Sequence, residues 1–557
     1  MSIEPSLLPL QRVYHWEAQR GGAVYLTQPM GGGALRHWTW AQAVDEARRV
    51  AAWLQGFGWP AGSRVAILSK NCAQWILSDL AIWMAGHVSV PLYPTLTAES
   101  VRQILEHSEA RAVFVGKLDD WAAMKPGIPA GVECFRCALS PAEPYPAWED
   151  IVARTAPIAG SPVRGAEELA TLVYTSGTTG MPKGVMHTFG NIAWAAKSLA
   201  DRFPTRPDDR MLSYLPLSHV AERWVVESGS IQGGFQVFFA ESLDTFAEDL
   251  RRARPSFFIS VPRLWVKFQQ GVYAKIPQKK LDRLLRIPIL SGIVRRKILQ
   301  GMGLDQVRMA GGGAAPMPPV VLDFFNRLGI ELLEGYGMTE NFGCSHSSLS
   351  GRARVGYVGE PYPGVEHKLD VNGEVLMRSP ALMKGYYKEP EKTREAITED
   401  GWLRTGDLGE IDEMNRLRIT GRAKELFKTS KGKYVAPAPI ENKLTAHGAV
   451  EACCVTGANF PQPFALVMAS QAALDAAREP AGRAALVTSL AEHLASVNAS
   501  LDAHEQLDFL AVVSDQWTVE NGLITPTLKV KRNVVEKRYE PQYERWARAR
   551  QPVVWAA

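Results

Sequence analysis

A stretch of glycines and small hydroxylated residues, 175–184, is the part of this sequence best suited to hold a polyphosphate. It reads TSGTTGMPKG and follows an apolar run at 170–174 that is typical of a buried strand. Glycines let backbone N–H groups approach an anion, hydroxyls add donors, and Lys183 adds a positive charge. The stretch departs from the Walker A pattern twice, because Pro182 replaces a glycine and Gly184 replaces Ser or Thr. It therefore predicts a phosphate loop of a different family.

Helical and strand patterns alternate through the first third of the chain, and this alternation predicts the scaffold that positions the loop. Strand patterns occupy 64–68, 88–92 and 112–115, and helical spacing of apolar residues occupies 40–57, 74–86 and 99–107. A strand–helix–strand rhythm favours parallel sheets covered by helices. We therefore expect an α/β fold.

The sequence pattern changes after about residue 364, where short strand patterns are separated by turn signals such as Asn372-Gly373. This change predicts a small β-rich subdomain. The sequence GRAKE at 421–425 marks a boundary, and the remaining tail is long enough for a small α+β domain. We predict an N-terminal domain at 1–421 and a C-terminal domain at 422–557.

Composition narrows the class of protein. The chain has 557 residues, 46% hydrophobic and 22% charged, and its net charge of +4 indicates no nucleic-acid partner. It shows no signal-peptide pattern and no apolar run of about 20 residues, so we expect a soluble or membrane-surface protein. Cys134 and Cys137 have metal or redox spacing but lack a second pair, which favours reduced cytosolic thiols.

Residues 279–303 form a basic amphipathic segment with two interpretations. Seven Lys and Arg residues are interleaved with ten Leu, Ile and Val residues in this segment. Such a segment can lie on an anionic membrane surface. The alternative, which we favour, is a surface helical hairpin with its apolar face in the core.

Five motifs follow one another along the chain: YTSGTTGMPKG at 174–184, GYGMTE at 335–340, TGD at 405–407, GRAKE at 421–425 and TPTLKVKR at 525–532. In this order they resemble those of the adenylate-forming superfamily, and within it the AMP-forming acyl-CoA synthetases.

Two further stretches, LPLSHVAER at 215–223 and SVPRLW at 260–265, resemble the medium- to long-chain fatty acid branch. Some related enzymes carry a gating tryptophan four residues after the histidine, where this chain has Arg223 followed by Trp224. The chain therefore departs from the gating pattern of those enzymes at position 223.

The resemblance implies a reaction and a fold. The fold has a large N-terminal AMP-binding domain of parallel or mixed sheets covered by helices, a β-rich subdomain, and a small mobile α+β C-terminal domain. The reaction joins a medium- or long-chain fatty acid to ATP as acyl-AMP, then transfers the acyl group to coenzyme A. The alternative is an acyl-AMP ligase that uses a carrier-protein thiol.

The implied ligands are ATP, Mg²⁺ and coenzyme A, and the implied partners are small-molecule substrates. We expect a cytoplasmic location, with peripheral membrane contact through 279–303 as the alternative interpretation of that segment.

The resemblance also implies roles for named residues. The nucleotide contacts fall on Thr175, Ser176, Gly177, Thr178, Thr179, Gly180, Lys183, Gly313, Ala314, Ala315, Tyr336, Gly337, Thr339, Asp407 and Arg422. The metal ligands fall on Thr175 and Glu340, and the catalytic roles on Lys529, Thr339 and His219.

Simpler interpretations compete for several of these residues. Asp407 in a Thr-Gly-Asp sequence fits a turn-capping role, and a lone His219 is more often structural. Lys529 lies near Lys531 and Arg532 in a basic run, where solvated charges are common. For each of these residues, its position in a family motif favours a role in the site over the simpler interpretation. The resemblance also implies a hinge at the motif that contains Lys424.

Overall fold

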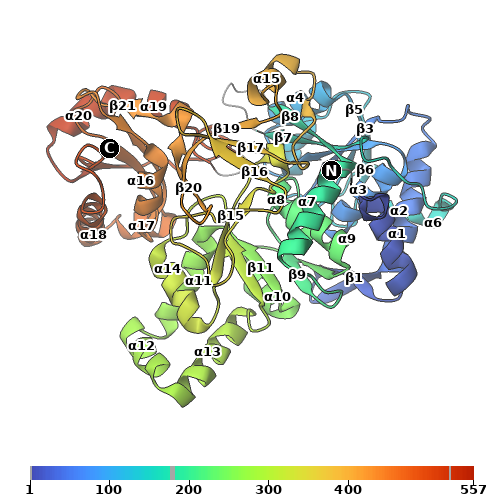
Figure 1. Ribbon diagram of the computed structural model, residues 1–557, viewed down its shortest axis with the longest axis horizontal. Helices are drawn as coiled ribbons and strands as arrows, with labels where there is room; N and C mark the ends of the chain where they lie inside the picture. Colours follow the sequence, from blue (N-terminus) through green and yellow to red (C-terminus); the bar gives the residue numbers. More distant parts are fainter. Residues whose placement is uncertain (1–2, 176–181, 526–528, 557) are drawn as a thin grey trace. The chain divides into compact units, whose positions relative to one another are not determined.

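The structure, a computed structural model, describes residues 3–175, 182–525 and 529–556. The chain divides into two compact units (Figure 1). The first comprises residues 1–367, 377–404 and 414–416, and the second comprises 368–376, 405–413 and 417–557. The domain boundary at 421 stays a prediction.

A mixed sheet of seven strands is the largest sheet of the first unit. Its order is β18 (Gly385–Tyr386), β8 (Lys183–Thr188), β7 (Leu169–Thr175), β4 (Val88–Leu92), β3 (Arg64–Leu68), β5 (Ala110–Val115) and β6 (Glu133–Arg136). Strands β7, β4, β3, β5 and β6 pair in parallel, whereas β8 pairs antiparallel with both β7 and β18. The predicted parallel sheet is therefore mixed at the end formed by β8 and β18.

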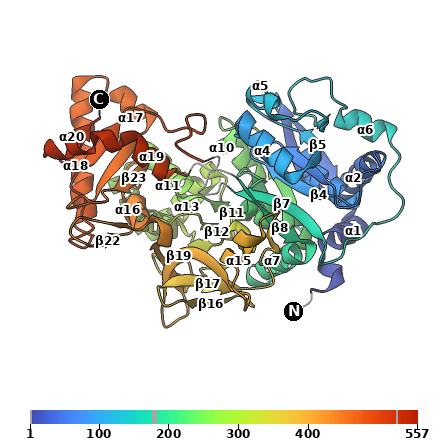
Figure 2. The same ribbon diagram turned by 90° about the horizontal axis from the view of Figure 1, so that it is seen from above.

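Both faces of this sheet are buried, because successive side chains along a strand point to opposite faces. Val65 and Ile67 belong to the core that contains α2 (Trp40–Gln55) and α3 (Ala73–Met84). Ala66 and Leu68 belong to a second core that contains α4 (Ala98–Ser108). Figure 2 shows α2 and α4 on either side of β4 and β5. The α/β fold class predicted from the sequence is confirmed.

Two further sheets complete the first unit. One has the order β2 (Ala34–Thr39), β1 (Val24–Gly31), β10 (Gln236–Phe239) and β9 (Arg210–Ser213). The other has the order β11 (Phe257–Ser260), β12 (Met309–Gly312), β13 (Leu332–Tyr336), β14 (His346–Ser347) and β15 (Glu360–Pro361). Strands β11, β12 and β13 are parallel, so their carboxyl ends meet at one edge.

Helices connect and cover these sheets. They include α1 (Pro9–Arg20), α5 (Trp121–Met124), α6 (Trp148–Arg154), α7 (Phe189–Arg202), α8 (Val220–Glu222), α9 (Gly229–Gly233), α10 (Phe246–Ala253), α11 (Pro262–Lys275), α14 (Pro319–Leu328) and α15 (Pro390–Ala396). Between α8 and α9 the chain forms a π-helix, η3 (Arg223–Ser228).

The basic segment forms two helices, α12 (Gln278–Arg286) and α13 (Pro288–Met302), as the helical hairpin interpretation predicts. Figure 1 shows them beyond α11 and α14, at the edge of the first unit. No helix in the described part of the chain has the length and apolar character needed to span a bilayer.

The second unit has its own sheets and core. A sheet ordered β16 (Glu366–Leu369), β17 (Glu374–Arg378), β19 (Leu403–Ile411) and β20 (Leu417–Arg422) lies mostly in this unit. The tail contributes β23 (Val450–Thr456), β24 (Phe464–Ala469), β25 (Leu510–Val513) and β26 (Val553–Trp555), with the small pair β21 (Phe427–Lys428) and β22 (Tyr434–Val435). Its helices are α16 (Pro437–Leu444), α17 (Gln471–Ala476), α18 (Pro480–Asn498), α19 (Arg532–Tyr539) and α20 (Tyr543–Arg548).

Candidate functional site

Strand pairing holds the two ends of the predicted phosphate loop together. Thr175 is the last residue of β7, Lys183 is the first residue of β8, and the two are cross-strand partners. Cβ atoms of directly opposed residues in an antiparallel pair lie about 5 Å apart. Ser176, Gly177, Thr178, Thr179 and Gly180 lie outside the described residues, so their predicted role stays a prediction.

One face of β8 carries two residues that contact other parts of the site. Because side chains alternate along a strand, Lys183, Val185 and His187 point to the same side. Tyr386 on β18 is paired with Val185 and therefore shares this side. The Lys183 ammonium lies 4.8 Å from the centre of the Tyr386 ring, a cation–π contact.

Tyr386 also connects Lys183 to the predicted metal ligand. Its hydroxyl donates to Oε1 of Glu340 at 2.7 Å. Burial and the nearby Glu340 charge raise the pKa of Tyr386 well above its ordinary value, so it remains a donor. Within the part of the chain that the structure describes, Oε2 of Glu340 has no hydrogen bond. One half-buried carboxylate with an open oxygen fits Mg²⁺, which binds through one or two carboxylates plus substrate phosphates.

His187 fixes the turn that carries Thr339 and Glu340. Its Nε2 lies 2.7 Å from the carbonyl oxygen of Thr339. A carbonyl only accepts, so Nε2 carries the proton and donates. Burial lowers the pKa of His187 to about 4, so the ring is neutral at pH 7. The turn itself, η4 (Thr339–Asn341), is also held by Asn341, which accepts from the Met338 N–H at 3.0 Å.

The predicted adenine-binding residues meet at the carboxyl ends of β12 and β13. A Cβ on Gly313 would lie 3.1 Å from the carbonyl oxygen of Gly335, so the two backbone segments are in close contact there. Ala314 has a φ of 68°, a conformation that costs energy for a residue with a side chain and often marks a functional site. Ala314 and Ala315 are exposed, and Tyr336 at the end of β13 is half-buried.

Gly337 follows Tyr336 and is required by packing. A Cβ at this position would lie 2.0 Å from the carbonyl oxygen of Gly343, well inside van der Waals contact. The structure therefore brings Gly313, Ala314, Ala315, Tyr336 and Gly337 together at one sheet edge.

His219 caps a helix. Its Nδ1 accepts from the backbone N–H of Ala221 at 3.1 Å, at the start of α8. The half-buried ring therefore has a structural role through one nitrogen. Its predicted role in lining the acyl or pantetheine site stays a prediction.

Arg223, which replaces the gating tryptophan, is buried in an ion cluster and is not a surface gate. Its guanidinium is 0% exposed and pairs with Asp79 and with Glu227, whose Oε2 lies 3.0 Å from Nε. It also donates to Oγ1 of Thr171 at 2.7 Å. Burial and the neighbouring Asp79 raise the pKa of Glu227 well above its ordinary value. The cluster joins α3, β7 and η3.

Glu222, immediately before Arg223, is a further buried acid outside this cluster. Its Oε1 accepts from Ser213 Oγ at 2.9 Å and from the Tyr214 N–H at 3.0 Å. Asn71 Nδ2 lies 3.3 Å from the same oxygen. Burial raises the pKa of Glu222 from 4.5 to about 8, so the carboxyl is largely protonated at pH 7. The sequence did not indicate that Glu222 and Glu227 are buried acids with raised pKa values.

In the second unit, two predicted ribose ligands are bound to each other. Asp407 on β19 and Arg422 on β20 are cross-strand partners, and Nε of Arg422 donates to Oδ1 of Asp407 at 2.7 Å. The backbone N–H of Asp407 donates to Thr405 Oγ1 at 3.1 Å. Lys424, the predicted hinge residue, is exposed in η5 (Ala423–Glu425).

The C-terminal basic run separates into different environments. Arg532 donates to both carboxylate oxygens of Glu441, at 2.7 and 2.9 Å, so it is a structural residue. Lys529 is exposed, and its backbone N–H donates to Thr525 Oγ1 at 3.1 Å. Arg532 is thus committed to an ion pair, and the catalytic role of Lys529 stays a prediction.

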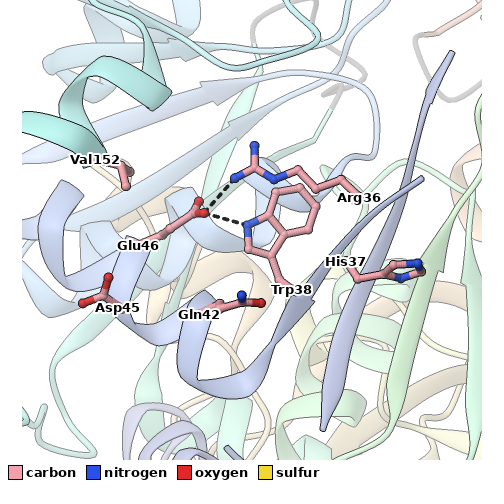
Figure 3. A pocket seen from close by; sticks show the side chains of 7 residues that line it. All are labelled: Arg36, His37, Trp38, Gln42, Asp45, Glu46 and Val152. Atoms are coloured by element: carbon pink, nitrogen blue, oxygen red, sulfur yellow. Dashed lines mark hydrogen bonds and ion pairs between the residues drawn. The ribbon is translucent and has the colours of Figure 1, made fainter. Parts of the chain in front are cut away.

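A pocket elsewhere in the first unit does not coincide with these residues. It has a volume of about 210 Å³ and is lined by Arg36, His37, Trp38, Gln42, Asp45, Glu46 and Val152 (Figure 3). Arg36 and Trp38 point toward Glu46 and donate to its Oε1 at 2.8 and 2.9 Å. Ligand sites are typically about 300–1,000 Å³, so this pocket is too small for a nucleotide.

Two residues with clear contacts to the site, His187 and Tyr386, were missed by sequence reasoning. His187 lies four residues beyond Lys183 in a strand, and its even spacing from Lys183 was the available signal. Tyr386 comes close to Lys183 only because β18 pairs with β8. No spacing along the chain indicates this pairing.

Comparison with known proteins identifies a family over most of the chain. The AMP-binding enzyme model matches residues 13–387, and the model of the AMP-binding enzyme C-terminal domain matches residues 425–548. The long-chain-fatty-acid–CoA ligase FadD15 of Mycobacterium bovis is 31% identical, over 91% of each chain. The peroxisomal long chain acyl-CoA synthetase 7 of Arabidopsis thaliana is 31% identical, over 91% of this chain and 81% of that one.

A solved structure shares the fold. The adenylation domain of a carboxylate reductase from Mycobacterium chelonae superposes with a TM-score of 0.80 at 25% identity, over 98% of this chain and 91% of that one. The resemblance to adenylate-forming enzymes inferred from the five motifs is confirmed.

Proposed function

The chain belongs to the AMP-binding enzyme family, and on that premise we propose that it is an AMP-forming acyl-CoA ligase. In this proposal it activates a medium- or long-chain fatty acid with ATP and then forms a thioester with coenzyme A. The observation that carries the proposal is the linked set of Lys183, Tyr386 and Glu340 beside the closed end of the β7–β8 hairpin.

The proposed reaction has two halves. In the first, a carboxylate oxygen of the fatty acid bonds to the α-phosphorus of ATP. The bond from that phosphorus to the bridging oxygen breaks, and pyrophosphate leaves with the electron pair. In the second, the sulfur of coenzyme A loses its proton and bonds to the acyl carbon. The acyl–oxygen bond breaks, and AMP leaves.

The first half needs positioning and charge neutralisation and requires no covalent protein nucleophile. We propose that Lys183 and the 175–180 loop hold the β- and γ-phosphates. The pairing of Thr175 with Lys183 supports this role, because it presents hydroxyl and ammonium groups from adjacent strand ends. Thr339 would donate to the α-phosphate from a turn fixed by His187.

Glu340 and Thr175 are the proposed ligands of Mg²⁺. When bound, Mg²⁺ supplies charge neutralisation on the phosphate oxygens. Tyr386 supports this assignment because its donated hydrogen bond orients Oε1 of Glu340 and leaves Oε2 open toward a cation.

The remaining roles follow the two units. In the first, the backbone at 313–315 and the Tyr336 ring would flank adenine, and His219 would line the acyl or pantetheine path. In the second, Asp407 would accept the ribose hydroxyls, with Arg422 as an added donor. Lys529 would neutralise charge on the attacking carboxylate. A swing of the domain at 422–557 about Lys424 would then exchange Lys529 for the coenzyme A path.

Cytoplasmic location is part of the proposal. All six cysteines are free thiols and buried, and burial raises the pKa of Cys137 and Cys453 well above the ordinary value. Protonated, buried thiols suit a compartment in which cysteines stay reduced.

Pyrophosphate release measured across a series of carboxylic acids, with and without coenzyme A, tests the proposal. We expect release to be fastest with acids of medium or long chain and AMP release to require coenzyme A. Activity restricted to aromatic or very short acids would refute the fatty-acid assignment.

A carrier-protein thiol as the acyl acceptor is the second candidate. The two reactions share the adenylation half, so the five motifs fit both. Adenylation without coenzyme A-dependent release of AMP would favour it.

A further inference from the structure

We propose that the turn between α12 and α13 binds the protein to an anionic membrane surface. Four apolar side chains at this turn, which we call the tip residues, face solvent. Their exposed fractions are 46% for Ile287, 82% for Ile289, 40% for Leu290 and 50% for Ile293. A contiguous exposed apolar group of this kind marks an interaction site.

The tip residues are separate from the face that attaches the hairpin to the protein. Leu281 on α12 is 0% exposed and belongs to the core that contains Phe324 and Phe325. Leu285, Val294, Ile298 and Leu299 pack partly buried against the same core. The hairpin therefore satisfies its structural requirement with one set of apolar residues and still presents a second set to solvent.

Positive charge surrounds the tip. The two helices carry seven bases and a single acid, Asp282, which is paired with Arg327 on α14. Six of the bases are exposed: Lys279, Lys280, Arg283, Arg286, Arg296 and Lys297. Across the described ranges 3–175, 182–525 and 529–556, none of these six forms an ion pair. The hairpin is thus an exposed cation cluster without internal neutralisation.

An anionic bilayer matches both features. Interfacial segments place apolar side chains at the headgroup boundary and bases against anionic headgroups. A second copy of this chain matches poorly, because two clusters of the same sign repel. A protein groove normally encloses its hydrophobic anchor, and Ile289 at 82% exposure protrudes as an insertion element would.

Co-sedimentation with vesicles tests the proposal, using the full chain without substrates. We expect binding to vesicles that contain phosphatidylglycerol and little binding to phosphatidylcholine alone. Raising the salt concentration to about 1 M shortens the Debye length to about 3 Å and should abolish the binding. Equal binding to both vesicle types would overturn the proposal.

Variants assign the binding to the tip. Ile289→Asp combined with Ile293→Asp should lower the partition coefficient at least tenfold, and Arg283→Gln combined with Arg286→Gln should lower it several-fold. Leu243→Asp is the matched control, because Leu243 is 93% exposed in a different loop and should leave binding unchanged. Thermal melting confirms that each variant is folded. Unchanged binding in both double variants would overturn the proposal.

Sedimentation velocity without lipid tests the alternative that a second copy of this chain, and not a membrane, covers the tip residues. If the tip instead joined two copies, Ile289→Asp would lower the molar mass, and that result would overturn the membrane assignment. Because vesicle binding is measured without substrates, failure of the proposed ligase activity would leave this test unaffected.

Discussion

Replacing Glu222 with glutamine should remove a large part of the pH dependence of stability. Burial raises the pKa of Glu222 from 4.5 to about 8 in the folded protein. A raised folded-state pKa means that the stability from Glu222 is fully present below pH 4.5 and is lost as the pH rises toward 8. Glutamine keeps an acceptor for Ser213 and Tyr214 but cannot ionise.

The magnitude follows from the width of this pH window. Between pH 5 and pH 7.5 the unfolded carboxyl is mostly ionised and the folded one mostly protonated. Each pH unit then costs about 1.4 kcal/mol, so the wild-type protein should lose about 3 kcal/mol that Glu222→Gln does not lose. The gain of the variant over the wild type should therefore grow by about 3 kcal/mol.

Urea unfolding at the two pH values, followed by tryptophan fluorescence, measures this difference. Ser213→Ala is the control, because it removes one hydrogen bond to Glu222 and leaves the ionisable group. We expect it to cost about 1 kcal/mol at both pH values. A constant difference between Glu222→Gln and the wild type from pH 5 to pH 7.5 would refute the reasoning.

Four more predictions concern side chains at the site or in the buried ion cluster. Lys183→Ala should lower kcat for pyrophosphate release by about 100-fold or more without changing the melting temperature, whereas Tyr386→Phe should mainly raise the Mg²⁺ concentration needed for half-maximal rate. Lys529→Ala should slow adenylation to a similar extent, about 100-fold, yet leave thioester formation from added acyl-AMP near the wild-type rate. Equal loss in both half-reactions would contradict its assignment. Arg223→Met should destabilise the protein by about 3–5 kcal/mol in urea unfolding, because Asp79 and Glu227 lose their buried partner.

Sequence patterns correctly located strands in which nearly every consecutive residue is buried. Residues 88–92 and 64–68 were predicted as strands with the observed bounds, since β4 is buried along its whole length and β3 from Val65 to Leu68, and most of their residues are apolar. Strand β8 was not predicted, because it begins with Lys183 and Gly184 and contains His187. Its place in the sheet depends on pairing with β7, which a local pattern does not reveal.

The departure of the loop from the Walker A pattern has a packing reason at Gly184. This glycine lies within β8, opposite Tyr174 of β7, and a Cβ there would approach Cζ of the Tyr174 ring to 3.1 Å. A serine or threonine in its place would crowd the ring. The residue therefore belongs to the strand and not to the loop.

The site could be predicted only in part, for the same reason. The motifs located Glu340 and Lys183, but their connection passes through Tyr386, more than 40 residues from one and 200 from the other. The ion pair of Arg422 with Asp407 likewise requires the β19–β20 register. Contacts formed by strand pairing are set by the tertiary fold and leave no trace in local spacing.

The π-helix η3 makes the number of residues in this segment as important as their identity. The pairing of Glu227 with Arg223 depends on their four-residue spacing in this π-helix, so loss of a residue between them would change the position of Glu227 around the helix axis. Glu227 would then leave Arg223, while Asp79 on a different helix would stay in place. A one-residue deletion within η3 should therefore be less tolerated than most substitutions, and an insertion there should be harmful for the same reason.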